Sequence, residues 1–187
     1  MKSFHRGTTI GNKVVNAEVR LPRKKETFLG SKRQGMFKCK GCAQCTFASS
    51  VIKGDIARHP TQGTHIKIKH YATCDTENVV YLFKCLCGKG NIGQAIRSIR
   101  TKMKDHLRNI RNFKHGSPTD MTVSRHFSEV NHNQSQLKWM VLEVIQPPHR
   151  EGNMKQCLLQ REFFWFKRLD TSHPVSMNDS WSVKFFL

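Results

Sequence analysis

The sequence has no apolar run of the length that crosses a bilayer, which takes about 18 consecutive residues. Residues 1–15 carry Lys2, Arg6 and Lys13 and lack the apolar core of a signal peptide. We also find no internal repeat, no low-complexity tract and no reverse-transcriptase motif. A chain of 187 residues with these absences is expected to be intracellular, outside the membrane, and built around one core.

Acidic residues are scarce. The chain has 13 Asp and Glu against 32 Lys and Arg, which gives a net charge of +19. This excess is larger than solubility requires, and its sign attracts polyphosphates. We therefore expect nucleic acid as the partner, with a ribosomal-type or membrane-surface protein as the alternative. Charge alone does not separate binding from cleavage.

Composition divides the chain into four parts. Residues 1–35 are rich in Lys and Arg, which predicts a flexible basic arm that contacts phosphate non-specifically. Within this arm, residues 14–21 could instead form an ordered strand. Residues 36–77 form a Cys-rich segment. The periodic elements fall within 78–170, and 171–187 form a tail that could fold back on the domain.

The periodic part predicts the element order β-β-α-α-β-α. Ile99, Met103 and Leu107 recur at helical spacing, and Ser117 before Pro118 resembles a helix N-terminus. The predicted elements are a β-hairpin over 78–93, helices over 94–112, 117–129 and 153–169, and a strand over 137–145. The first helix carries Asp105 as its single acid, so its exposed face is strongly positive. This face could contact a phosphate backbone, or it could simply be a solvated helix surface. The candidate nucleic-acid contacts in and beside it are Arg97, Arg100, Lys104, Arg108 and Arg111.

The seven cysteines suggest metal binding, because thiols in a reducing compartment bind metal more often than they pair. An iron–sulfur cluster is disfavoured, since Ser49 stands where a ferredoxin-like run carries its fourth Cys. Free thiols are the remaining alternative, and Cys157 beside Leu158 is expected to be a buried core thiol. The candidate ligands of a tetrahedral structural zinc are Cys39, Cys42, Cys45 and Cys74.

A set of residues suited to phosphodiester chemistry occurs in a fixed order along residues 78–170. The set comprises Val79-Val80-Tyr81, Asn91-Ile92-Gly93, Lys102, His106 and Glu162 within Arg161-Glu162-Phe163-Phe164-Trp165. Singly, Tyr81 could be a core aromatic, His106 a satisfied imidazole and Glu162 a surface acid. Together they resemble the GIY-YIG endonuclease family, and most closely its variant in Penelope-like retroelements, which has Val-Val-Tyr, a Cys-x-Cys between the motifs and a preceding Cys-rich segment.

The resemblance implies a small three-stranded antiparallel sheet flanked by helices, an α+β fold, and nicking of DNA. The basic arm and this expected DNA substrate suggest a nuclear location. It implies that Glu162 holds one magnesium ion, that Tyr81 and His106 activate the attacking water, and that residue 102 steadies the phosphate. It also implies a second zinc at a Cys-x-Cys with two histidines, with His106 as a competing ligand. The ligands of this second site would be Cys85, Cys87, His126 and His132.

Two positions depart from the family pattern. Asn91 replaces the second-motif tyrosine, and Lys102 replaces an arginine whose planar fork grips two phosphate oxygens. The alternative function is therefore a catalytically inactive, zinc-stabilised nucleic-acid-binding remnant. A cellular RNA-binding zinc protein would be favoured if Glu162 were remote from Tyr81 and His106.

Overall fold

The computed structural model describes residues 33–39, 49–60, 62–147, 153–171 and 176–178. They all belong to one compact unit, Arg33–Leu187. The predicted basic arm up to Lys32 lies outside the described residues, as do Cys42, Cys45 and the last nine residues of the tail.

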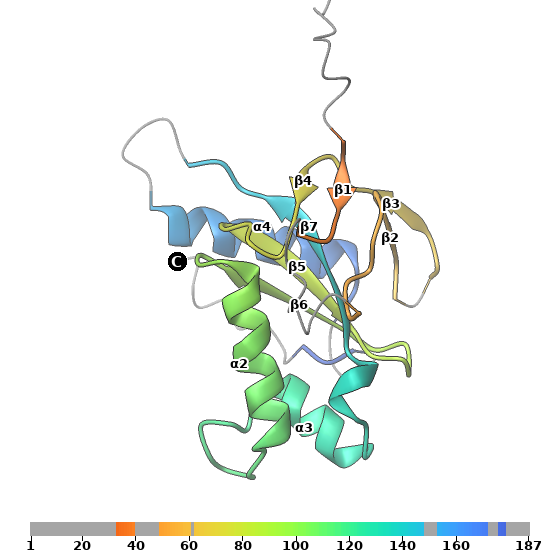
Figure 1. Cartoon of the computed structure of the whole chain (residues 1–187), viewed down its shortest axis with the longest axis vertical. Helices are drawn as coiled ribbons and strands as arrows, with labels where there is room; N and C mark the ends of the chain where they lie inside the picture. The colour runs from red at the N-terminus through yellow and green to blue at the C-terminus, as the bar shows by residue number, and fades with distance from the viewer. Residues whose placement is uncertain (1–32, 40–48, 61, 148–152, 172–175, 179–187) are drawn as a thin grey trace, which may run out of the picture. The chain divides into compact units, whose positions relative to one another are not determined.

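The fold is mixed α/β, and its centre is a three-stranded antiparallel sheet in the order β6-β5-β7 (Figure 1). Its strands are β5 (Val79–Lys84), β6 (Gly90–Ala95) and β7 (Lys138–Val144). Residues 79 to 83 of β5 are all buried, as expected for a central strand covered on both faces. The predicted hairpin and the predicted strand over 137–145 are confirmed.

The first predicted helix begins later than expected. Gln94 and Ala95 pair with Val80 and Val79, so the sheet hydrogen bonds hold them in β6 rather than in a helix. Ile96, which fits the helical spacing, is half exposed in the connection. The helix itself, α2, runs from Ile99 to Arg111 and buries Met103 and His106 along with Ile99.

The second predicted helix is also shorter than expected. α3 spans Thr122–Glu129, because Ser117 caps a turn instead: its hydroxyl donates to the Lys114 carbonyl. A 3-10 helix, η1 (Gln134–Gln136), precedes β7. The third prediction is confirmed, since α4 spans Met154–Arg168 and the Asn153 side chain accepts a hydrogen bond from the Lys155 backbone N–H. No helix in the described ranges has the length and apolarity of a membrane span.

Four short strands that the sequence did not predict lie in the described part of the Cys-rich segment and at Gly35 just before it. β1 (Gly35–Met36) pairs in parallel with β4 (Tyr71–Ala72), and β2 (Ile56–Arg58) forms a hairpin with β3 (His65–Lys67). Two or three residues are too short a window for a period-2 pattern to stand out. A bridge between Val51 and Trp139 joins this segment to β7.

Part of the predicted tail packs against β6. The Asn178 side chain both accepts from the Ile92 N–H and donates to the Ile92 carbonyl, and the Met177 N–H donates to the Gly90 carbonyl. These bonds use backbone groups that the outer edge of the sheet would otherwise leave unpaired. Residues 176–178 are thus bonded to Gly90 and Ile92, the residues directly before and after Asn91 in the chain.

Candidate functional site

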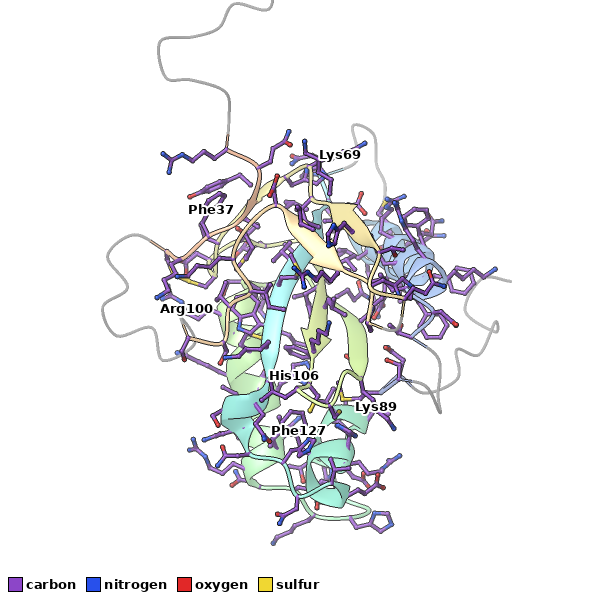
Figure 2. The ribbon with its side chains drawn as sticks, turned by 90° about the vertical axis from the view of Figure 1, so that its right-hand side faces the viewer. Phe37, Lys69, Lys89, Arg100, His106 and Phe127 are labelled. Atoms are coloured by element: carbon purple, nitrogen blue, oxygen red, sulfur yellow. A yellow bond between two sulfur atoms is a disulfide. The ribbon has the colours of Figure 1, made fainter. Side chains whose placement is uncertain are left out.

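Tyr81 and His106 are in contact at the centre of the domain. The Tyr81 hydroxyl lies 3.1 Å from His106 Nε2, which joins β5 to α2. The His106 ring also meets the edge of Phe83, with ring centroids 4.5 Å apart. Both side chains are buried, and Figure 2 shows His106 directed toward the strands. The sequence predicted both residues as site residues, and the structure brings them together.

Burial fixes the protonation states of this pair. It raises the pKa of Tyr81 far above the usual range of a phenol, and the Glu162 carboxylate raises that pKa further. Burial lowers the pKa of His106 to about 3, and the Lys102 ammonium lowers it as well. At neutral pH the site therefore contains a neutral phenol and a neutral imidazole. A phenol O–H that donates to Nε2 fits both states.

Glu162 on α4 belongs to the same cluster. Burial raises the pKa of its carboxyl to about 7, although the Lys102 ammonium acts in the opposite direction. Glu162 thus interacts electrostatically with both Tyr81 and Lys102. The Glu162 carboxylate acts electrostatically on Tyr81, whereas the RNA-binding alternative would be favoured by a Glu162 remote from Tyr81 and His106. Three elements, β5, α2 and α4, supply the four side chains.

The register of the β5–β6 hairpin explains why a glycine, Gly93, ends the Asn91-Ile92-Gly93 motif. Tyr81 pairs with Gly93, and Phe83 pairs with Asn91, so these four residues share one face of the sheet. A Cβ atom on Gly93 would overlap the Tyr81 ring. Asn91 is buried, at 8% exposure. Gly93 therefore makes room for the Tyr81 side chain, a role that a single sequence does not reveal.

Sequence reasoning missed Glu143, which fixes α4 on the sheet. Its Oε2 atom accepts hydrogen bonds from Arg161 Nε and Nη2 at 2.9 and 2.8 Å, and from Trp165 Nε1 at 2.7 Å. Charge-assisted bonds of this kind restrain both rotation and sliding of a helix. Arg161 directly precedes Glu162, so these bonds help to aim Glu162. No spacing rule links Glu143 on β7 to α4.

We expect Glu162→Gln to stabilise the metal-free protein at pH 8. The carboxyl has a pKa of about 7 in the folded protein against an ordinary pKa of 4.5, so folding favours its protonated form and stability falls as pH rises between these values. An amide avoids this loss, which is worth up to about 3 kcal/mol. Thermal melts should show the variant above wild type at pH 8 and close to it at pH 4.5. A variant that melts lower at both values would contradict the effect.

Four potential metal ligands gather where the hairpin meets α3. The ligand atoms of Cys85, Cys87, His126 and His132 all lie within 4.8 Å of one another. Cys85 Sγ lies 3.1 Å from His132 Nδ1, and Cys87 Sγ lies 3.4 Å from His126 Nε2. The prediction that these four residues lie together is confirmed. His106, the competing ligand, is instead bonded to Tyr81.

The chemistry of this Cys/His cluster fits a metal such as zinc. Two sulfur and two imidazole donors make up a common structural zinc set. Burial raises the pKa of the Cys85 thiol and lowers the pKa of His126, so the metal-free cluster holds a neutral thiol and imidazole. A bound cation would favour the thiolate and the neutral imidazole that ligate it. It would also tie the hairpin to α3 and to the turn that follows.

The N-terminal cysteines differ from the prediction. Cys39 and Cys74 are joined by a disulfide, with Cα atoms 6.1 Å apart, where free zinc-binding thiols were expected. Only after reduction of this bond would the two sulfur atoms and a nearby Asp75 oxygen be available to a metal. Cys42 and Cys45 lie outside the described residues. Only half of the four-thiolate set is thus placed by the structure.

The predicted nucleic-acid contacts separate into two groups. Arg100 forms an ion pair with Asp75 at 2.8 Å and lies 3.6 Å from Cys39 Sγ, so it is directed toward the Cys-rich segment (Figure 2). These contacts give Arg100 a structural role, and its contact with nucleic acid stays a prediction. The other four predicted cations are exposed: Arg97, Lys104, Arg108 and Arg111.

Comparison of the chain with protein-family models, curated proteins and solved structures gave no significant match.

Proposed function

We propose that the chain is a GIY-YIG-type endonuclease of retroelement descent that nicks DNA with one magnesium ion. The observation that carries the proposal is the Tyr81–His106 hydrogen bond together with the electrostatic effects of Glu162 on Tyr81 and of Lys102 on His106. These four residues come from three separate elements. The +19 net charge supports a nucleic-acid substrate. The nucleus is the location such a substrate suggests.

Each residue of the cluster would have a distinct task. Neutral His106 can accept a hydrogen bond from the Tyr81 hydroxyl and so orient the phenol oxygen toward the attacking water. The Lys102 ammonium would lie beside the scissile phosphate and offset its growing negative charge. Glu162 would hold the magnesium ion, which when bound would supply further positive charge to the phosphoryl oxygens.

The environment of Glu162 fits such an ion. The carboxylate is partly buried, and its raised pKa of about 7 means that a nearby cation would stabilise its charged form. Magnesium commonly binds through one or two carboxylates and keeps several waters, so one side chain is a sufficient protein anchor. We propose that zinc occupies the Cys85/Cys87/His126/His132 cluster and has a structural role only.

The alternative function is a DNA-binding remnant without activity. Asn91 and Lys102 favour it, because the first lacks a phenol and the second lacks a bidentate fork. The loss of one oriented donor typically lowers a rate by about 10²- to 10³-fold. Both functions predict salt-sensitive binding, and they differ over cleavage.

A supercoiled-plasmid nicking assay with magnesium tests the proposal. We expect wild type to convert supercoiled plasmid to the nicked circle, and Glu162→Gln to leave it intact while still binding the same plasmid. The stabilising effect expected of this variant separates lost chemistry from lost folding. Nicking that persists in Glu162→Gln would exclude the proposed site, and binding without any nicking by wild type would favour the remnant.

A further inference from the structure

A groove of about 480 Å³ lies along one side of α2. Lys104, Arg108 and Arg111 line it from the helix, Ser49 and Ser50 line a second wall, and residues 133–135 line a third. The three cations occupy positions i, i+4 and i+7, so they form one stripe on the helix surface. Lys102 precedes Lys104 by two positions and therefore points to another side of α2.

Two of the walls are held in place by hydrogen bonds. The Ser50 carbonyl accepts from the Trp139 N–H at 2.9 Å, and the Ser49 carbonyl accepts from Lys138 Nζ at 3.0 Å, which fixes this segment to β7. On the opposite wall, the Asn133 side chain accepts from the Ser135 N–H at 3.0 Å. The groove is thus a built feature rather than a space between loose loops.

The groove is strongly positive. It has three cationic residues and no acidic residue among those that line it. Asp105 approaches Arg108 at 3.2 Å and offsets part of its charge, so the groove keeps a net positive charge from the three cations against this one acid. The hydroxyl and amide groups of the other walls can donate further hydrogen bonds to an anion.

We propose that this groove binds the phosphate backbone of a duplex DNA segment outside the cleaved one. The cationic stripe spans about 10 Å along α2, so it can reach more than one phosphate of a strand. Because it lies on a different side of α2 from Lys102, it would hold the DNA beside the catalytic cluster without touching the reacting phosphate. The identity of the partner rests on the proposed function, whereas binding in the groove is measurable without cleavage.

The test compares two triple variants that lose the same charge. The groove variant is Lys104→Gln, Arg108→Gln and Arg111→Gln. The control neutralises exposed cations in and just after the β2–β3 hairpin with Arg58→Gln, Lys67→Gln and Lys69→Gln. Fluorescence anisotropy with a labelled DNA duplex at several salt concentrations gives affinity and its salt dependence. We expect the groove variant to lose roughly 10²-fold in affinity. The slope of its log affinity against log salt concentration should correspond to about two to three fewer phosphate contacts, and the control should lose much less of both.

Equal losses in the two triple variants would overturn the inference, because only net charge would then matter. A groove variant that loses affinity for single-stranded RNA but not for duplex DNA would also overturn it. If the groove variant loses DNA binding while wild type never nicks plasmid, the inference holds and the proposed nuclease fails. If wild type nicks plasmid and the groove variant binds DNA normally, the nuclease holds and the inference fails.

Discussion

A double variant, Cys85→Ser with Cys87→Ser, is expected to lose one bound zinc and most of its resistance to heat. The ion would join the end of β5 to α3, and both cysteines would then be absent from the Cys/His cluster. Structural zinc contributes roughly 10 kcal/mol or more in peptides that fold only with metal. This domain has its own core, so we expect a smaller loss of roughly 5 kcal/mol. Zinc content by mass spectrometry and thermal melts measure both effects.

Cys157→Ser is the matched control, because Cys157 lies on α4 and outside the cluster. It should keep the zinc and melt close to wild type. A chelator should lower the melting temperature of wild type and of Cys157→Ser, and leave the double variant unchanged. Wild-type protein that is purified without zinc, and that melts at the same temperature with added zinc, would contradict a metal in this cluster.

The elements that the sequence predicted well have strong local signals. The continuous apolar run of β5 indicates a buried central strand, and Asn153 before a periodic stretch marks the start of α4. The start of α2 was missed because Gln94 and Ile96 suit a helical pattern while the pairing of β6 with β5 holds the chain extended to Ala95. Hydrogen bonds between strands are not visible in a local pattern, and here they outweigh it.

The same limit applies to the candidate site. The family resemblance implied the Cys/His cluster. Sequence spacing alone could not show which of the ten histidines lie beside Cys85 and Cys87. Glu143, Arg161 and Trp165 meet only when β7 and α4 come together, so their hydrogen bonds are invisible in sequence. The Cys39–Cys74 disulfide likewise depends on the pairing of β1 with β4.

The second large effect is expected from restoring the two departures from the family pattern. Asn91→Tyr with Lys102→Arg should raise magnesium-dependent nicking by about 10²-fold or more, because each change restores an oriented donor. Asn91 shares a face of the sheet with Tyr81, so a phenol there would join the existing cluster. An arginine at 102 would keep the positive charge near Glu162 and add the planar fork.

The limited space around position 91 determines which control experiments this double variant needs. Asn91 is buried, and Ser176 and Asn178 bond to Gly90 and Ile92 on either side of it, so a larger ring could displace the tail. Thermal melts and the single variant Lys102→Arg separate that cost from the catalytic gain. Adding Glu162→Gln to the double variant should abolish the gain. A well-folded double variant that binds plasmid and nicks no faster than wild type would show that Asn91 and Lys102 do not limit the reaction.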